Sequence, residues 1–476
     1  MTDSSPIATS LDLPSLALPK PTGKYAVGTT EYSFIDSERD ETYTDDPNDK
    51  REITAKVWYP SEEVPNAKTA PYLSEEYSQA IATAQQIPSE DFQAIVESIE
   101  TNSVTDAPLA ETESEYPVLI FSHGFGDLPE LNSIKAEELA SQGYIVVGIN
   151  HTYDSAVSIL DDGQIIPASA IFTEIEDESQ IDRLLGEAIE VRSADARFVL
   201  DELEAIAEST DLLSGIDLER TGIFGYSLGG ATAAKVLAED DRFGAGINLD
   251  GGLFGDSGNA SLTQPFMFQN NQAFGAEDPT DERLDQLNQI QQSFVTNLQN
   301  DGYEVTIDGT EHNNFNDLSF LSPFLINSGI ELGSLNEVFA PNGNSEFEPI
   351  LPQQANEIIN SYSTAFFNRY LSDRQSSLLT EDPSPYPEVT FQTYPVDNND
   401  ITGLSTNQAT GLNIFIGEDI VLDSTLGESI LELTESLPFD ELEIVRGRGD
   451  NSGDLLVNYE SETIAIFDDI ISTNSI

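Results

Sequence analysis

The chain has 476 residues, a length that corresponds to two or three domains at about 150 residues each. Its 19 basic and 86 acidic residues give a formal net charge of −67, which disfavours binding to nucleic-acid phosphates, anionic membrane surfaces and anionic substrates, and favours neutral or zwitterionic ones. Because no cysteine is present, disulfide scaffolds, thiolate metal sites and cysteine nucleophiles are excluded.

The N-terminal segment, residues 1–22, contains Ser, Pro and Leu without a period and is predicted to be a loose tail. Residues 1–14 carry neither a basic n-region nor an apolar h-region, so no cleaved secretory signal is apparent. No run in the sequence reaches the roughly 18 apolar residues that a membrane span needs. These features favour a cytoplasmic protein, whereas the acidity and the lack of cysteine also fit export by another route or a habitat of high salt.

The first β-structure is predicted from residue 23 to about residue 60. Within it residues 53–59 alternate and are β-branched or aromatic, and the acidic stretch 36–50 before them is predicted to be a long hairpin turn. Residues 61–115 are polar and partly helical, with one candidate helix near residues 77–81. This stretch either covers a site or forms a surface insertion.

The next region alternates between apolar runs and helical patterns. Continuous apolar runs are expected of strands that are buried on both faces. The runs lie at residues 117–121, 144–149, 221–224, 244–249, 265–268 and 303–307. The helical patterns lie near residues 136–140, 187–207, 228–239 and 352–371. This alternation predicts an α/β domain over residues 23–375, with a mostly parallel central sheet and helices on both faces.

A Pro- and Asp-rich stretch follows, and residues 376–400 are predicted to be a linker. Beyond it the helical pattern stops, and short apolar or alternating runs are separated by Gly, Asn and Asp. The runs lie at residues 413–416, 430–433, 442–445, 455–459 and 463–467. They predict a small all-β C-terminal domain over residues 401–476.

Residues 225–229 match the pattern G-x-S-x-G, directly after the predicted strand 221–224 and at the start of an Ala-rich helix. The tight strand-to-helix turn needs small residues on both sides of the serine, and Gly225 and Gly229 supply them. Ser227 then projects above the sheet, where the helix N-terminus favours negative charge. Ser227 is therefore the candidate nucleophile.

A second glycine-containing segment ends the first buried strand. Gly124 and Gly126 allow the backbone there to turn its N–H groups toward a ligand. The N–H groups of Phe125 and Leu228 are together predicted to form an oxyanion hole.

The chain has three histidines, His123, His151 and His312. A hydroxyl nucleophile needs a base, and in the chain order Ser…Asp…His the base follows Ser227, which leaves His312. His312 lies in a loop directly after the last predicted strand, where an α/β sheet carries its functional loops. His123 is expected to brace the loop that contains it, and His151 to form a pocket wall or to brace a loop.

Two aspartates are candidates for the third member of a Ser-His-Asp triad. Asp250 ends the predicted strand 244–249, and Asp278 follows the next strand. Either is placed to reach Nδ1 of His312, and the spacing does not decide between them.

Four segments, residues 121–126, 225–230, 249–250 and 312–317, together resemble the plasma-type platelet-activating factor acetylhydrolases and their bacterial α/β-hydrolase relatives. The resemblance covers roughly residues 24–372. It implies an α/β-hydrolase fold and a cofactor-free, metal-free serine ester hydrolase. The implied activity resembles that of 1-alkyl-2-acetylglycerophosphocholine esterases, which remove short acyl chains from lipid or phospholipid esters in lipid degradation.

The resemblance also selects Asp250 as the acid, because in that family the acid ends the strand after the nucleophile helix. The sequence departs from the family over residues 61–115, 153–190 and 320–350, and these segments are expected to reshape the pocket. Several apolar loop residues either line that pocket or belong to the core. They are Phe125, Phe315, Phe320, Leu321, Phe324 and Leu325.

Two other functions remain open at this stage. One is a polyester or lactone hydrolase of the same fold. The other is a secreted binding protein whose hydrolase domain is vestigial and not catalytic. The oligomeric state is not predicted.

The C-terminal region is similar to the terminal segments of repeats-in-toxin proteins, on the evidence of residues 417–423 and 437–444. That resemblance implies export in one step with an uncleaved C-terminal signal, and hence a secreted protein. The Gly- and Asp-rich calcium nonapeptides are absent, which argues against calcium binding. The polar residues 450–454 are predicted to be a hairpin turn, with a weak cation site as the alternative.

Overall fold

The computed structural model describes residues 15–84, 87–113, 115–169, 178–207, 215–273, 282–328, 349–380 and 384–394, together with five strands between residues 412 and 467. The chain divides into two compact units, Met1–Val396 and Asp397–Ile476, each of which is described by itself.

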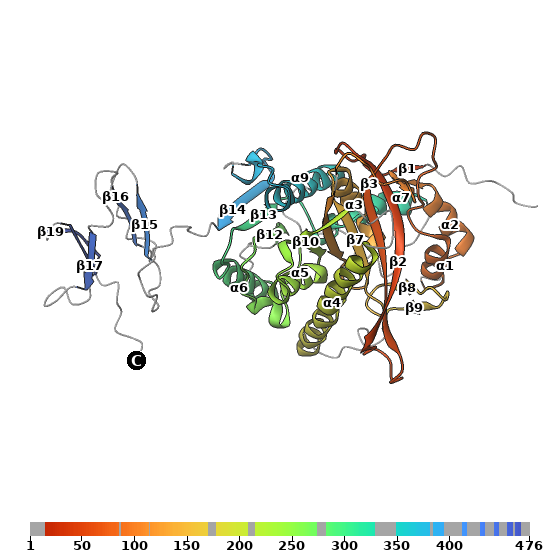
Figure 1. Cartoon of the computed structure of the whole chain (residues 1–476), viewed down its shortest axis with the longest axis horizontal. Helices are drawn as coiled ribbons and strands as arrows, with labels where there is room; N and C mark the ends of the chain where they lie inside the picture. Colours follow the sequence, from red (N-terminus) through yellow and green to blue (C-terminus); the bar gives the residue numbers. More distant parts are fainter. Residues whose placement is uncertain are drawn as a thin grey trace, which may run out of the picture. The chain divides into compact units, whose positions relative to one another are not determined.

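The first unit is built on a ten-stranded sheet with the order β14-β13-β12-β11-β10-β6-β7-β3-β2-β5 (Figure 1). The strands from β13 to β7 run parallel, and the antiparallel pairs β13–β14, β7–β3 and β3–β2 extend the sheet on both sides. The strands are β2 (Ala26–Asp40), β3 (Lys50–Ser61), β5 (Ser103–Thr105), β6 (Tyr116–Ser122), β7 (Ile145–Asn150), β10 (Ile216–Tyr226), β11 (Phe243–Leu249), β12 (Phe266–Asn271), β13 (Gly302–Ile307) and β14 (Val389–Tyr394). Two further pairs are β1 (Leu16–Ala17) with β4 (Ile99–Glu100), and β8 (Val157–Ile159) with β9 (Ile165–Pro167).

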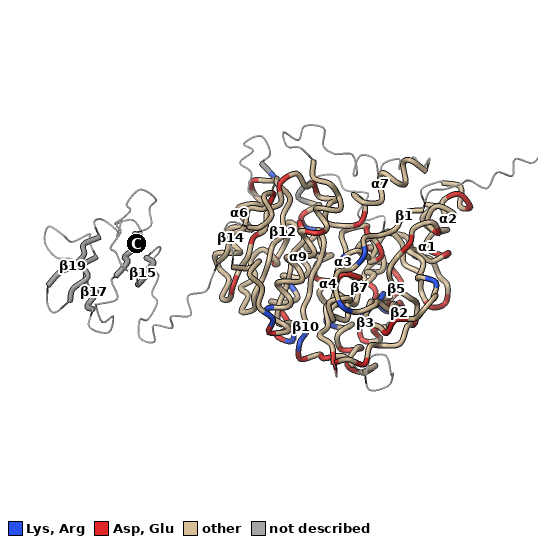
Figure 2. Tube along the Cα trace, turned by 90° about the horizontal axis from the view of Figure 1, so that it is seen from above, with Lys and Arg blue, Asp and Glu red and all other residues tan. Residues whose placement is uncertain are grey.

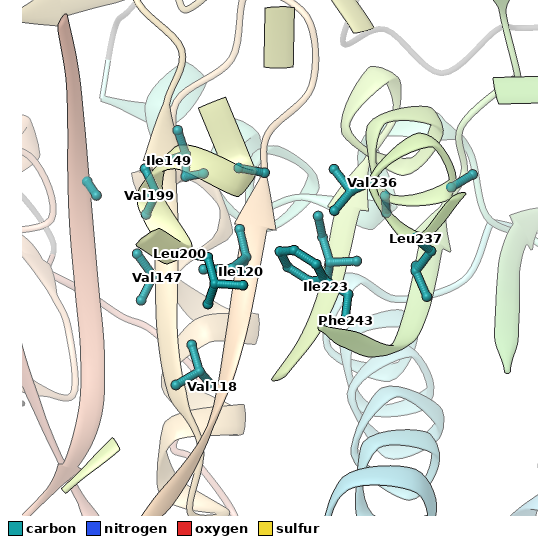
Figure 3. Packing of buried hydrophobic residues seen from close by; sticks show 14 of the residues in the cluster. Val118, Ile120, Val147, Ile149, Val199, Leu200, Ile223, Val236, Leu237 and Phe243 are labelled. Carbon is teal, nitrogen blue, oxygen red and sulfur yellow. The ribbon is translucent and has the colours of Figure 1, made fainter. Parts of the chain in front are cut away.

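Helices cover both faces of this sheet, which is why its central strands are apolar throughout. Val118 and Ile120 of β6 pack with α4 and α5, whereas their neighbours Leu119 and Phe121 pack with α3 and α9. Figure 3 shows the first of these layers, in which side chains of β6, β7 and β10 meet Val199 of α4 and side chains of α5. The helices concerned are α3 (Ser133–Ser141), α4 (Glu178–Ala207), α5 (Leu228–Glu239), α6 (Glu282–Thr296) and α9 (Pro352–Leu371).

A third apolar cluster joins three helices from the segments that depart from the family pattern. These are α1 (Glu75–Ala84), α2 (Ser89–Glu97) and α7 (Leu318–Asn327). Their buried side chains include Tyr77, Phe92 and Leu321, and Leu321 joins this cluster although it lies more than two hundred positions beyond the other two in the chain.

The predicted elements of the sheet and its helices agree closely with the structure. The predicted helices 228–239 and 352–371 coincide with α5 and α9 at both ends. The predicted hairpin turn is too long, because residues 36–40 continue β2 before the chain turns back into β3.

Two predictions about connecting segments are wrong. The N-terminal tail is not loose over residues 15–22, because β1 pairs with β4 and Leu18 is buried. The segment 376–400 is not simply a linker, because β14 within it forms the edge of the main sheet beside β13. Both segments pair their backbone groups with a neighbouring strand, which their polar composition does not reveal.

The described elements of the second unit are strands. β15 (Leu412–Ile416) pairs in parallel with β16 (Ser429–Leu433), and β17 (Leu442–Arg446), β18 (Leu455–Tyr459) and β19 (Glu462–Phe467) form an antiparallel meander. Residues 417–423, 437–441 and 450–454, on which the export and hairpin predictions rest, lie outside the described residues. Among the described helices of the chain, none combines the length and the apolar character that crossing a bilayer requires.

Candidate active site

Ser227 occupies the turn between the end of β10 and the first residue of α5. Its backbone has φ 54° and ψ −121°, a conformation that costs a non-glycine residue on the order of 1–3 kcal/mol. This turn points the side chain away from the sheet, and α5 begins directly after it, at Leu228. The N–H groups of the first helical turn have no partner within the helix and favour a negative charge near the serine.

Two glycines allow the helix to come this close to the sheet. A Cβ atom on Gly225 would lie 2.0 Å from the carbonyl oxygen of Gly229, and one on Gly229 would lie 1.9 Å from the carbonyl oxygen of Ser122. Any side chain at either position would therefore push α5 away from the ends of β10 and β6.

His312 and Asp250 approach Ser227 from two neighbouring loops. His312 begins the short turn His312–Phe315 beyond β13, and its Nε2 lies 3.0 Å from Oγ of Ser227. Its Nδ1 lies 2.6 Å from Oδ2 of Asp250, which directly follows β11. The imidazole also lies against the ring of Tyr226, with 4.9 Å between the ring centroids.

Asp250 is held rigidly for this contact. It is 1% exposed, its φ is 56°, and its carboxylate accepts hydrogen bonds from the backbone N–H and the side-chain amide of Asn271, at 2.6 and 2.8 Å. Asp278, the other candidate for the acid, lies outside the described residues. The structure therefore brings Ser227, His312 and Asp250 together in one hydrogen-bonded chain.

The loop that carries Phe125 packs directly on the turn that carries Ser227. A Cβ atom on Gly124 would lie 2.9 Å from the ring of Tyr226 and 3.4 Å from Cβ of Ser227. Gly126 has a φ of 65°, and its N–H donates to the carbonyl oxygen of Asp154 at 3.0 Å. The two predicted oxyanion donors, the N–H groups of Phe125 and Leu228, are therefore carried by two backbone segments next to Ser227: the Gly124–Gly126 loop and the first residue of α5.

The other two histidines lie beneath this loop and are fully buried. Nδ1 of His123 lies 2.6 Å from the carbonyl oxygen of Gly124. Because a carbonyl oxygen can only accept a hydrogen bond, Nδ1 carries the proton and donates it. Burial lowers the pKa of His123 well below its ordinary value and that of His151 to about 4, so both rings are neutral at pH 7. His123 braces its loop as expected. Of the two roles expected for His151, the structure shows the bracing one, because its backbone N–H donates to Nε2 of His123 and its side chain is not among the residues that line the pocket.

A pocket with a volume of about 400 Å³ opens beside Ser227 and His312. Its apolar lining comes mainly from α1, α2, α7 and the segments next to them. The apolar residues include Leu73, Ile81, Phe92, Val96, Leu131, Leu321 and Leu325. The polar insertion 61–115 therefore covers the site, and the sequence pattern alone did not distinguish this from a surface insertion.

The six apolar residues proposed as pocket lining divide into two groups. Phe125, Leu321 and Leu325 line the pocket, whereas Phe315 and Phe324 lie in the buried clusters behind it and Phe320 packs against one of them. Leu321 and Leu325 also belong to the buried cluster that contains Phe324, because positions three and four apart share one face of α7.

Asp127 also lines the pocket, two residues beyond Phe125. It is buried, and its burial raises its pKa to about 7. Among the described residues that line the pocket, none is Lys or Arg. Nor do the described His, Asp and Glu side chains form a group of three or more that would hold a metal ion.

Comparison with known proteins decides the family. The family model "Platelet-activating factor acetylhydrolase, isoform II" matches residues 12–168 and 187–377. The chain belongs to this family. The match ends at residue 377, within the first unit.

Individual relatives agree with this assignment. The platelet-activating factor acetylhydrolase of Cavia porcellus is 28% identical over 407 residues, which cover 79% of this chain and 84% of the relative. A probable 1-alkyl-2-acetylglycerophosphocholine esterase of Arthroderma benhamiae is 27% identical over 281 residues, covering 58% and 66%. Among solved structures, a ferulic acid esterase from Streptomyces cinnamoneus aligns with a TM-score of 0.65 and 25% identity, over 79% of this chain and 99% of the neighbour.

These matches confirm three predictions for this chain: its family, its α/β-hydrolase fold and its activity as an esterase. The resemblance of the C-terminal region to repeats-in-toxin segments is outside the matched residues and stays a prediction.

Proposed function

We propose that this esterase hydrolyses short-chain esters of neutral or zwitterionic lipids through a Ser227–His312–Asp250 triad. The observation that carries the proposal is the hydrogen-bonded chain from Asp250 through His312 to Ser227 at the mouth of an apolar pocket. In such a chain the acid fixes the imidazole tautomer, and the free Nε2 serves as a base for the hydroxyl.

The reaction proceeds in two halves. Oγ of Ser227 attacks the ester carbonyl while Nε2 of His312 takes its proton, and the N–H groups of Phe125 and Leu228 stabilise the resulting oxyanion. When the intermediate collapses, His312 returns the proton to the leaving alcohol and an acyl-serine remains. Water then attacks the acyl-serine with His312 again as the base, and the carboxylic acid is released with Ser227 restored.

The substrate class is supported by the pocket and the charge of the protein. An apolar volume of about 400 Å³ suits a short acyl group or part of an alkyl chain. The net charge of the chain is −67, and it repels net anions. Figure 2 shows Asp and Glu distributed along the described trace, with fewer Lys and Arg. The relatives named acetylhydrolase and 1-alkyl-2-acetylglycerophosphocholine esterase point to acetylated choline lipids.

The test is hydrolysis of a choline phospholipid with an acetyl group at sn-2, beside the same lipid with a palmitoyl group there. We expect turnover of the acetyl lipid and little turnover of the palmitoyl lipid. Ser227→Ala should reduce kcat by roughly 10⁴-fold or more and abolish labelling by a fluorophosphonate probe. Labelling of Ser227 without turnover of either lipid would instead favour a polyester, lactone or aryl ester, whereas an unlabelled wild-type protein would indicate a vestigial site.

We also infer that residues 401–476 serve export and not catalysis. The family match ends at residue 377, and the first unit already contains the complete set of candidate catalytic residues. Deletion of residues 401–476 should leave esterase activity in a lysate unchanged and remove the protein from the culture medium. Loss of activity with secretion retained would contradict this assignment.

A further inference from the structure

Arg192 of α4 is fully buried and reaches the carbonyl groups behind the loop that carries Phe125. Its Nη1 donates to the carbonyl oxygen of His123 at 2.5 Å, and its Nη2 donates to the carbonyl oxygen of Gly124 at 3.3 Å. A guanidinium holds its donors in a fixed plane, so it fixes two consecutive carbonyl groups relative to each other.

The same guanidinium is itself held in place by Asp154. Nε of Arg192 lies 2.7 Å from Oδ2 of Asp154, and Nη2 lies 2.5 Å from Oδ1, a bidentate pair that is almost completely buried. The backbone carbonyl of Asp154 also accepts the N–H of Gly126. Arg192 and Asp154 therefore hold the loop at both ends, before and after Phe125.

The peptide between Gly124 and Phe125 is the part of the loop that matters for an oxyanion. Its carbonyl oxygen lies 2.6 Å from Nδ1 of His123, 3.3 Å from Nη2 of Arg192 and 3.2 Å from the backbone nitrogen of Asp127. A trans peptide is planar, with its N–H antiparallel to its C=O. Because the donors to the carbonyl lie on its buried side, the N–H of Phe125 points to the opposite side.

We propose that Arg192 is a positioning residue of the oxyanion hole, which holds the Gly124–Phe125 peptide so that the Phe125 N–H is aimed at the substrate oxygen. Arg192 is not among the residues that line the pocket, so it acts through the loop backbone and not by touching the substrate. The proposal rests on the proposed function, because it assumes that Ser227 is the nucleophile. Its physical basis is that a preformed donor needs no reorganisation when the oxyanion develops.

Arg51 provides a matched control. It is equally buried and also forms a bidentate pair, with Asp195, but it donates to the carbonyl oxygen of Thr152 and not to His123 or Gly124. Arg51→Lys and Arg192→Lys both replace a buried guanidinium by an ammonium, which keeps the charge and loses the planar fork. Only the second change should release the peptide that carries the Phe125 N–H.

The experiment compares kcat and KM of these variants on p-nitrophenyl acetate and on its thiono analogue, whose sulfur is a poor hydrogen-bond acceptor. Arg192→Lys should lower kcat on the oxygen ester by about 10²-fold, with KM changed less than about threefold and a much smaller loss on the thiono ester. Arg51→Lys should keep the ratio of oxygen-ester to thiono-ester rates within about threefold of the wild type. Circular dichroism and thermal unfolding identify which variants are folded.

Asp154→Asn is the second variant, because it is isosteric and tests the same clamp if Arg192→Lys does not fold. It should lower the oxygen-to-thiono rate ratio about tenfold. The proposal is overturned if a folded Arg192→Lys or Asp154→Asn protein keeps the wild-type ratio, or if Arg51→Lys changes the ratio as strongly. Retained activity in Ser227→Ala would overturn the proposed function instead, so the two failures are distinguishable.

Discussion

The first unit contains two Ser–His–Asp chains with nearly the same internal geometry. In one, Nε2 of His312 lies 3.0 Å from Oγ of Ser227, and Nδ1 lies 2.6 Å from Asp250. In the other, Nε2 of His151 lies 3.0 Å from Oγ of Ser122, and Nδ1 lies 2.9 Å from Asp195. The two sets differ in their surroundings, and the surroundings explain why we assign catalysis to only one of them.

Access is the first difference. The side chain of His312 is 47% exposed and lines the pocket with Ser227, whereas Ser122, His151 and Asp195 are all fully buried. The backbone is the second difference, because Ser227 stands at positive φ before a helix, whereas Ser122 is the last residue of strand β6. A buried serine in a strand has neither room for a substrate nor a helix N-terminus beside it.

Charge is the third difference. Asp195 accepts from Arg51 at 2.6 Å and from Arg39 at 2.6 Å, whereas the hydrogen-bond donors to Asp250 besides His312 are the neutral groups of Asn271. Burial alone would raise the pKa of Asp195, but Arg51 and the hydrogen bond from His151 lower it well below its ordinary range. Two arginines already neutralise Asp195, so it has little charge left to stabilise an imidazolium. Three side chains in the right order are therefore not sufficient for catalysis.

The difference in role between the two sets is tested most directly by replacing the aspartate of each set with asparagine. Asp250→Asn should lower kcat by roughly 10⁴-fold, because the imidazole tautomer is no longer fixed, and should leave the fold intact. Asp195→Asn should instead lower the free energy of unfolding by about 3–5 kcal/mol, because it removes one of the two buried carboxylates that pair with Arg51 and leaves only Glu41. Its kcat per folded molecule should stay within severalfold of the wild type.

Steady-state kinetics on p-nitrophenyl acetate and denaturant unfolding measure both quantities on the same samples. An Asp195→Asn protein that is stable but inactive would assign catalysis to the buried set and would falsify the division proposed here. An active Asp250→Asn protein would point to Asp278 as the acid, and Asp278→Asn would then be the decisive variant.

The pH dependence of stability distinguishes the two histidines further. His151 has a pKa of about 4 in the folded protein, against about 6.5 for an unfolded histidine. Between these pH values the unfolded chain binds a proton that the folded chain does not, so the free energy of unfolding falls as the pH falls, by up to about 3 kcal/mol.

His151→Gln should remove that contribution, and the measurement is urea unfolding at half-unit steps from pH 4 to pH 8. Asp127, whose pKa is raised to about 7, acts in the opposite direction over the same range, since its stabilising effect is greatest in acid. Asp127 is present in both proteins, so the difference between the two curves isolates His151. A difference curve without slope between pH 4 and 6.5 would mean that His151 is not buried as a neutral ring.

Much of this fold was predictable because its signals are local. The central strands are apolar on both faces, α5 begins at the residue after Ser227, and α9 begins at Pro352 and ends at Leu371. The nucleophile followed from its strand-turn-helix context, and His312 followed because the chain has only three histidines.

The parts that were missed depend on contacts between distant positions. Asp250 and Asp278 both follow neighbouring strands, so their spacing did not separate them; the family resemblance selected Asp250, and the structure shows its carboxylate in contact with His312. The pairing of Arg192 with Asp154 joins a helix to a loop 38 positions away, and no periodicity encodes it. The edge strand β14 alternates between half-buried and exposed residues in a polar segment, which resembles a linker in sequence.

The smallest effect on activity is expected at Ser122, the serine of the buried set. Ser122→Ala removes the hydroxyl that contacts Nε2 of His151 and leaves this buried nitrogen without its donor, at a cost of about 1–3 kcal/mol in the free energy of unfolding. Turnover of p-nitrophenyl acetate should stay within about twofold, and fluorophosphonate labelling should be unchanged, whereas Ser227→Ala loses both. Because Arg192 also approaches Oγ of Ser122, at 3.4 Å, a larger loss of kcat in Ser122→Ala would show that this hydroxyl helps to orient the guanidinium behind the oxyanion loop.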